Sequence, residues 1–384
     1  MSAATTAAWT PPQAPVRLPS AAAVAGLRAG DAWRCLRTAC APFREGTRFQ
    51  ALPDVRFWGD GARQRAPGAR LPGVGDRAAS AYRARLEAAG LSSFALRVDE
   101  PLLADAPLWQ AARALLADAL GANRAPVLPV SAALTLCSGV ERPPWTWPAG
   151  HARLVAVLQG RLRIGGEVGD ACAGDAAWLP ARTPVPQDPG ALLLVLSIAA
   201  DPATIRSATR AAAEDLLLRL LERRHPDPGT VAMLPSPPAT DGARGVATIP
   251  ALRALAQALA AAPLHATLAE AVALDAALRT SSLGLAPRPP PPPPAPLRDD
   301  ARVRLCAQGI VRQRLDDARW LFAVNGHPLI ADDRAGWRRL WARLCEGGAW
   351  RVDALAGRGR DAAALRAWLV ALQALGGLCA DDAG

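Results

Sequence analysis

The alternation of apolar and polar positions between residues 142 and 198 predicts short strands separated by tight turns. An apolar run at residues 154–158 is followed by Gly160 and by the alternating residues 161–164, which is the pattern of a buried strand, a turn and a half-buried strand. Two more apolar runs, at residues 176–180 and 192–198, stand on either side of a proline-rich loop. Because short strands with Gly and Pro turns are typical of sandwiches and barrels, we expect a β-barrel here.

Helix and strand patterns precede this barrel. We expect strands at residues 55–58, 94–98 and 127–136, and helices at 78–89 and 108–120, which end at Gly90 and Gly121. Residues 1–25 contain mainly small residues and prolines, so they predict a disordered lead with little to bury. The result is an α+β chain with one barrel domain over residues 26–200.

The barrel segment resembles the bacterial Jumonji-type (JmjC), cupin-like 2-oxoglutarate oxygenases. Their pattern is His-x-Asp, a strand ending in Gly-x-Lys, then Gly-Asp, an apolar residue or two, Pro and a distal His. Gly160, Gly174-Asp175 and Leu179-Pro180 match the turns of that pattern over roughly 60 residues. The resemblance implies a double-stranded β-helix, or jelly roll, with Fe(II) and 2-oxoglutarate as cofactors of active members.

The functional positions of that pattern hold other residues in this chain. Aligned on the matching turns, Trp147 stands at the first His, Ala149 at the Asp, Val185 at the distal His and Leu162 at the Lys. Iron(II) in such enzymes needs two imidazoles and one carboxylate, and these side chains offer no donor atom. We therefore expect no metal and no cofactor. A displaced ligand set of His151 with Asp170 or Asp175 is the alternative.

Several side chains near these positions suit another ligand. Arg161 and Arg163 flank Leu162, and Arg182 precedes Val185, so the three predict either a residual anion site or plain surface charge. Trp145 and Trp147 predict either a plug of the former iron pocket or a stacking platform for a peptide.

The chain beyond the barrel predicts three parts. Residues 201–286 predict a helical segment, with helices at 203–224, 250–262 and 268–278. These helices pack either within their own domain or, as the resemblance implies, against a second copy in a homodimer. Residues 287–297 include six consecutive prolines and predict a polyproline II linker. Residues 298–384 resemble a winged-helix module, with helices at 303–309, 337–345 and 362–375, a strand at 320–324 and an Asn325-Gly326 hairpin.

The amino-acid composition limits the reactions and binding sites that this chain can provide. All 44 basic residues are arginines, so lysine Schiff-base chemistry is excluded, and the net charge of +10 attracts anionic partners. The seven cysteines form no Cys-x-x-Cys pair, which argues against a zinc knuckle or a disulfide framework and favours reduced core thiols. The N-terminus has neither a signal peptide nor a membrane span, so we expect a cytoplasmic protein without a membrane partner.

Three functions remain open. The first is a catalytically degenerate cupin-like protein, a pseudoenzyme that binds a protein or peptide. The second is a peptide or protein hydroxylase with Fe(II), 2-oxoglutarate and the displaced ligand set. The third is a nucleic-acid-binding regulator that uses arginines near residues 334–343. Trp337 and Leu340 mark the buried stripe of a helix there, and the arginines then belong to its solvated face. We therefore do not expect a nucleic-acid partner.

Overall fold

The computed structural model describes residues 10–18, 26–47, 52–121, 124–126, 128–140, 142–164, 169–183, 185, 188–224, 264–290, 297–306 and 309–380. The chain divides into two compact units: Met1–Ile205 together with Ala277–Gly384, and Arg206–Ala276. Within the described residues, no helix combines the length and the apolar character that crossing a membrane requires.

A large antiparallel sheet dominates the first unit. Its eight strands run in the order β1-β9-β6-β10-β5-β4-β2-β3, and a separate two-stranded sheet pairs β7 with β8. The strands are β1 (Val16–Leu18), β2 (Asp54–Gly59), β3 (Ala62–Gln64), β4 (Phe94–Asp99), β5 (Ser131–Ser138), β6 (His151–Gln159), β7 (Arg161–Leu162), β8 (Ala171–Cys172), β9 (Ala176–Leu179) and β10 (Leu192–Ala199). This mixed architecture with a large antiparallel sheet is consistent with the predicted cupin-like fold.

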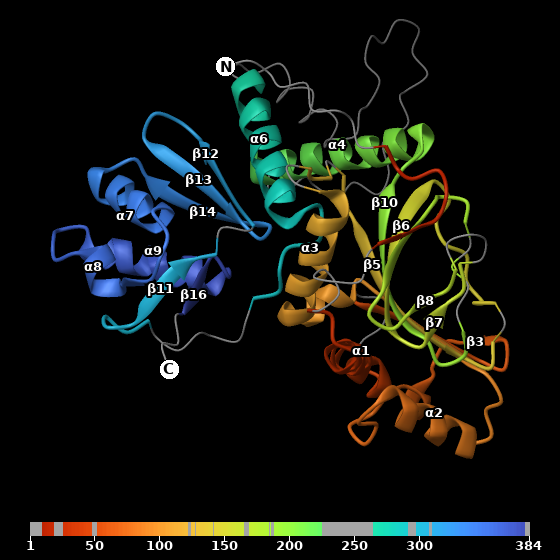
Figure 1. Ribbon diagram of the computed structural model, residues 1–384. Helices are drawn as coiled ribbons and strands as arrows, with labels where there is room; N and C mark the ends of the chain where they lie inside the picture. The colour runs from red at the N-terminus through yellow and green to blue at the C-terminus, as the bar shows by residue number, and fades with distance from the viewer. Residues whose placement is uncertain are drawn as a thin grey trace, which may run out of the picture. The chain divides into compact units, whose positions relative to one another are not determined.

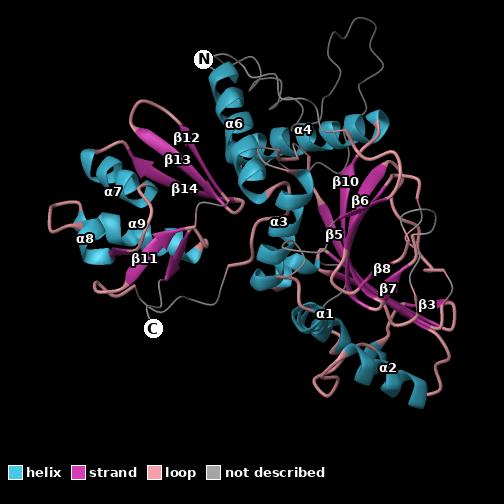
Figure 2. Ribbon diagram, viewed as in Figure 1, coloured by secondary structure: helices cyan, strands magenta, loops and turns pink. Residues whose placement is uncertain are grey.

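Helices cover one face of the large sheet, and the small sheet covers the other. The covering elements are α1 (Ala29–Arg44), α2 (Ala79–Ala88), α3 (Ala106–Leu120) and the 3-10 turns η1 (Gly68–Arg70) and η2 (Pro101–Ala104). Trp33, Tyr82 and Trp109 from the helices join one apolar core with alternate residues of the strands. Figure 1 shows α3 on one side of β5, β6 and β10, with β7 and β8 on the other, and Figure 2 shows the same layers by type of element.

The opposite face of the strands forms a second, smaller core. Val155 and Val157 on β6 pack with Leu193 and Val195 on β10, and Leu162 on β7 joins them. Side chains of a strand alternate between its two faces, so these valines point away from the helices. All five side chains are inaccessible to solvent. This face of the sheet, which we call its inner face, is therefore aliphatic around the middle of β6 and β10.

The ends of α3 follow from local sequence. The Asp105 side chain accepts a hydrogen bond from the Leu108 backbone N–H at 2.8 Å, which caps the first turn. At the other end, Gly121 adopts φ +79°, a conformation that side chains disfavour, and the helix stops there. Gly121 is the signal that predicts the end of the helix expected at residues 108–120, and the observed helix begins two residues earlier.

The structure differs from the sequence-based expectations at three places before residue 140. Residues 16–18 are not part of a disordered lead, because they form β1 and pair with residues 176–178 of β9. The Arg17 guanidinium also lies 2.7 Å from the buried carboxylate of Asp175. The predicted strand at residues 127–136 is displaced, since β5 begins at Ser131. Helix α1 was not predicted, although Pro42 lies only in its last turn and its buried residues all precede that proline.

Two long helices follow the barrel. They are α4 (Pro202–Arg224) and α6 (Leu264–Ser282), in agreement with the helices predicted at 203–224 and 268–278. The predicted helix at residues 250–262 and the prolines at 291–296 lie outside the described residues. The homodimer predicted for this segment stays a prediction.

The C-terminal region holds two three-stranded sheets, β15-β11-β16 and β12-β13-β14. Its elements are β11 (Arg302–Leu305), β12 (Ile310–Arg314), β13 (Arg319–Val324), β14 (His327–Asp332), α7 (Ala335–Cys345), β15 (Trp350–Arg351), α8 (Val352–Ala356), α9 (Ala362–Ala374) and β16 (Leu378–Ala380). The hairpin is confirmed: Val324 pairs with His327, and Asn325 and Gly326 both have positive φ. A winged-helix arrangement stays a prediction.

The helix predicted at residues 303–309 is wrong. Residues 302–305 form β11, with Val303 buried between the exposed Arg302 and Arg304. This alternation has the period of a strand, and the run is too short for helical periodicity to be separated from it.

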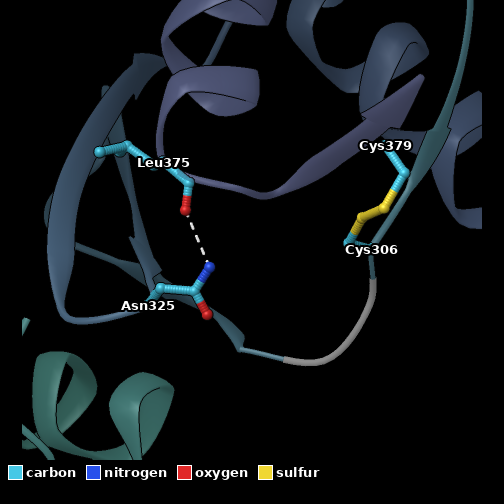
Figure 3. The surroundings of a disulfide bond; sticks show 4 residues. All are labelled: Cys306, Asn325, Leu375 and Cys379. Atoms are coloured by element: carbon cyan, nitrogen blue, oxygen red, sulfur yellow. Dashed lines mark hydrogen bonds between the residues drawn. A yellow bond between two sulfur atoms is a disulfide. The ribbon is translucent and has the colours of Figure 1, made fainter. Parts of the chain in front are cut away.

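The cysteines depart in part from the expectation of reduced core thiols. Cys306 and Cys379 form a disulfide between β16 and the residue after β11, shown in Figure 3 beside the hydrogen bond that Asn325 donates to the Leu375 carbonyl. Cys35, Cys40 and Cys137 are free and buried as predicted, and Cys172 and Cys345 are free and exposed. Sequence spacing gave no signal for the bridge, because its partners are 73 residues apart.

A buried carboxyl near the barrel predicts a pH dependence of stability. Glu100 follows β4, its side chain accepts a hydrogen bond from the Ala132 N–H at 3.2 Å, and burial raises the pKa of its carboxyl from 4.5 to about 7. The folded chain holds the Glu100 proton more tightly than the unfolded chain does. The stability that this proton contributes is therefore fully present below about pH 4.5 and is lost as pH rises through about 7. We expect Glu100→Gln to be more stable than the wild type at pH 8 by about 1–2 kcal/mol.

Urea unfolding of both proteins at pH 5 and pH 8 checks this, because the difference between them isolates Glu100 from the other carboxyls. A constant difference between the two pH values would contradict the raised pKa.

Candidate functional site

Polar side chains lie beside the aliphatic core on the same face of the sheet. Arg153 on β6 stands directly across from Ser197 on β10, and Arg97 on β4 stands across from Thr135 on β5, which in turn lies across from Leu193 of the aliphatic core. Arg153 is two residues from Val155, so it points to the same inner face. A buried arginine is unusual in a strand that is otherwise apolar, so Arg153 distinguishes this end of β6.

A cavity of about 1080 Å³ opens beside Arg153. Its volume is slightly above the roughly 300–1,000 Å³ that is usual for small-ligand sites. It is lined by Arg142, Pro143, Trp145, Thr146, Trp147, Ala149, Gly150, Arg153, Ala181, Arg182, Thr183, Val185 and Asp201. The lining thus comes from the loop before β6, from β6 itself, from the loop after β9 and from the residue before α4.

Tryptophan rings form part of the cavity wall. The rings of Trp145 and Trp147 meet edge to face, with centroids 6.3 Å apart, and Trp145 also contacts Trp58 of β2 at 5.3 Å. The Arg97 guanidinium lies 4.5 Å from the centre of the Trp147 ring, a cation–π contact. The two tryptophans line an open cavity instead of filling it, which favours a stacking platform over a plug.

The charge of Arg97 is balanced within the protein. Its Nε atom donates to the Asp99 carboxylate at 2.7 Å, and Arg56 of the neighbouring strand lies 3.4 Å from the same carboxylate. Arg97 therefore serves to hold Trp147 in place, with its charge satisfied by Asp99.

Arg153 is in a different situation. Its side chain is almost entirely buried, at 3 % exposure, and no ion pair joins it to any acid among the described residues. Its Nη2 atom donates to the backbone carbonyls of Pro180, Ala181 and Thr183 at 3.1, 2.9 and 2.6 Å, which fixes the loop after β9. Burial lowers the pKa of this guanidinium from its ordinary value. Its Nε atom has no hydrogen-bond partner.

Asp201 is the acid in the lining, and its carboxylate is already engaged. One oxygen accepts hydrogen bonds from the backbone N–H groups of Ala203 and Thr204, both at 2.9 Å, and the other accepts from the Thr204 hydroxyl. These bonds cap the first turn of α4, and those from Thr204 are the main cause that lowers the pKa of the carboxyl. With Arg142, Arg153 and Arg182 around it, the cavity carries a net positive charge.

The residues at this site do not fit an iron ion. Trp147, Ala149 and Val185 all lie in the cavity lining, so the three positions that the family pattern assigns to metal ligands do converge, but none has a donor atom for a metal. His151 starts β6 with its Nδ1 atom 3.0 Å from the Ala149 carbonyl, and Asp175 pairs with Arg17. Across the described parts of the chain, no three His, Cys, Asp or Glu side chains are grouped to hold a metal ion.

The structure separates the three arginines that the sequence singled out. Arg182 lines the cavity, whereas Arg161 and Arg163 are exposed on and after β7 and are not among the lining residues. Arg163 instead pairs with Asp188. The position of the family's lysine, Leu162, is fully buried in the aliphatic core. Any anion bound in the cavity would therefore meet a different set of donors from the one that the family pattern implies.

Sequence reasoning missed Arg97 and Arg153. Arginine is so frequent in this chain that neither position stands out by composition. The signal that could have found Arg153 is the alternation of side chains along a strand. Arg153 points to the same face as Val155 and Val157, in a strand that is buried along nearly its whole length.

Comparison with known proteins yields matches among solved structures only. No protein-family model and no curated protein matches the chain. Among solved structures, the chain is similar to YcfD, a ribosomal oxygenase from Escherichia coli, with 16% identity, a TM-score of 0.44 and coverage of 96% of this chain and 94% of that one. A structure of YcfD with cobalt and 2-oxoglutarate matches with 18% identity and a TM-score of 0.37, covering 75% of this chain and 78% of that one. At these scores we draw no argument about the site from the similarity.

Proposed function

We propose that this chain is a JmjC-type, cupin-like protein that has lost iron chemistry and binds a segment of a peptide or protein at the mouth of its barrel. The observation that supports the proposal is the cavity wall itself. Where the family pattern has its metal ligands, Trp147, Ala149 and Val185 line a cavity of about 1080 Å³ that has aromatic and cationic walls. Rings such as these offer large, rigid contact areas to a peptide.

The chemistry left at the site supports binding rather than turnover. Among the described residues, the lining contains no histidine, cysteine or glutamate, and its aspartate, Asp201, is occupied in capping α4. A general acid or base needs a titratable group within hydrogen-bond reach of its substrate and free to exchange a proton. Arginine, tryptophan and threonine donate hydrogen bonds without exchanging protons near neutral pH.

A peptide-display selection on metal-stripped protein in the presence of a chelator tests the proposal. We expect peptides to be enriched on the wild-type protein and lost on Ala149→Trp, because Ala149 is exposed in the cavity lining and an indole there fills the mouth. Ala89→Trp, at an exposed position after α2, is the matched control and should retain the same peptides. Manganese(II) with 2-oxoglutarate should leave the affinity of these peptides unchanged.

Two results would overturn this function. Enrichment that survives Ala149→Trp would move the binding surface away from the barrel mouth. Peptide binding that strengthens with manganese(II) and 2-oxoglutarate, and loses this gain in His151→Ala, would instead indicate a hydroxylase with the displaced ligand set.

A further inference from the structure

A second hollow adjoins the cavity at the barrel mouth. Its volume is about 320 Å³, and it shares Ala181, Arg182 and Asp201 with the lining of the larger cavity. The two spaces therefore meet at the loop after β9 and at the residue before α4. The other residues around the second hollow are Pro11, Pro12, Gln13, Pro180 and Ala200.

The segment before β1 forms one wall of this hollow because of where β1 pairs. Strand β1 lies at the edge of the large sheet, and its Val16 stands across from Trp178 of β9 in antiparallel register. The same register, continued back along the chain, sets Pro12 beside Arg182. The start of the chain is thus carried along the loop after β9 towards the mouth.

Prolines keep this segment from pairing with the loop. Pro11, Pro12 and Pro15 have no backbone N–H, so they cannot extend the ladder that β1 makes with β9. Among the described residues, no backbone hydrogen bond joins residues 10–15 to the loop at 180–183. A strand that paired here would close the gap. The prolines instead leave the hollow open, and their fixed φ angles limit the entropy that the wall loses when a ligand binds.

The walls of the hollow suit an aromatic side chain. They consist mainly of three proline rings and two alanine methyl groups, and an aromatic ring buries a large apolar area against such surfaces. The volume lies at the lower end of the roughly 300–1,000 Å³ of small-ligand sites, so it is sized for one large side chain and not for a longer segment. The residues that carry these rings and methyl groups are all half-buried: Pro11, Pro12, Pro180, Ala181 and Ala200.

The charge at the junction of the two spaces selects the residue next to that ring. Arg182 is exposed and borders both spaces, and Arg142 is exposed in the wall of the larger one. Asp201, the acid at the junction, is engaged in the cap of α4. Complementary charge therefore favours an acidic residue beside the aromatic one and opposes a basic residue there.

We propose that the peptide bound at the barrel mouth places an aromatic side chain in this second hollow, between residues 11–12 and the loop after β9, with an acidic residue beside it at Arg182. This inference rests on the proposed peptide-binding function and adds the side chains that the peptide must present. It also makes the segment before β1 a part of the binding site.

A photoreactive analogue of N-acetyl-phenylalanine amide tests the hollow by itself on the full-length protein. We expect irradiation to label residues 10–13 and 180–182, located by mass spectrometry after proteolysis. Pro11→Ala/Pro12→Ala removes two rings from the wall and should reduce this labelling by about fivefold or more. Pro15→Ala is the matched control, because Pro15 is a half-buried proline of the same segment outside the lining, and it should retain the labelling.

Peptides enriched by the display selection then test whether the two spaces bind one ligand. Replacing their aromatic residue with alanine should weaken binding to the wild-type protein by about tenfold. The same replacement should matter little for Pro11→Ala/Pro12→Ala, because both changes remove one contact. Replacing the acidic neighbour with lysine should also weaken binding, and Arg182→Glu should reverse this preference. Arg161→Glu makes the same charge change at an exposed position outside both linings and should not.

The outcomes separate this inference from the function on which it rests. If residues 10–13 and 180–182 are not labelled, or are labelled equally in the double proline variant, the aromatic hollow is overturned and peptide binding at the mouth is still decided by the display selection. Enriched peptides without an aromatic residue, or with one that contributes equally in the double proline variant, would overturn the joint site and leave peptide binding intact. Labelling without any enriched peptide would overturn the proposed function and the joint site, and would leave the hollow as a site for an isolated aromatic group.

Discussion

Replacing Gly150 with alanine is expected to lower the free energy of unfolding by about 2–4 kcal/mol. Gly150 has φ +74°, and a Cβ atom placed on it would overlap the Asp201 carboxylate and the Thr204 hydroxyl. The Gly150 carbonyl also accepts hydrogen bonds from the N–H groups of Ala200 and Asp201. The new methyl group must therefore displace the cap of α4 in addition to straining the backbone.

Gly61→Ala provides the control for Gly150→Ala. Gly61 has a similar φ of +80°, but nothing lies within 4 Å of an added Cβ atom there. Gly61→Ala should lower the free energy of unfolding only by the strain of the left-handed backbone, about 1–2 kcal/mol. Urea unfolding of both variants makes the comparison. Equal losses would show that the contact between Gly150 and the start of α4 contributes nothing to stability.

The double variant Cys306→Ala/Cys379→Ala is expected to lose about 4 kcal/mol of stability, the second large effect. The disulfide joins residues 73 apart in sequence, so it removes much of the freedom of the unfolded chain between them. Its partners lie where Leu305 of β11 pairs with Leu378 of β16, which brings the first and last strands of the C-terminal region together. Guanidinium unfolding followed by tryptophan fluorescence gives the difference.

Cys345→Ala is the matched control for the disulfide, because Cys345 is a free and exposed thiol in the same region. It should change stability by no more than about 0.5 kcal/mol. If the double variant unfolds at the same denaturant concentration as this control, the disulfide does not stabilise the protein.

The elements that were predictable carry a local signal. The Asn325-Gly326 turn, the capped helix α3 and the buried strand β10 are each defined by residues adjacent in sequence, and each forms within a few residues of its predicted bounds. Strand β11 lacks such a signal, because three alternating residues do not separate a strand from a helix. Pairings such as β1 with β9 depend on partners about 160 residues apart and leave no local trace.

The candidate site also has features that the sequence predicts and features that it does not. The convergence of Trp147, Ala149 and Val185 was predictable from the spacing of the turns around them, and the three do line one cavity. The role of Arg153 was not, because its distinguishing properties are burial, the lack of an acidic partner and a free Nε atom. These properties arise only once β6, β10 and the loop after β9 are assembled around it.

The aliphatic packing between β6 and β10 limits where a molecule can bind on this face of the sheet. Val155, Val157, Leu193 and Val195 have no solvent-accessible surface, so no ligand can lie against the middle of the two strands. A ligand in the cavity is instead confined to the start of β6, where Arg153 and the loop before the strand form part of the wall.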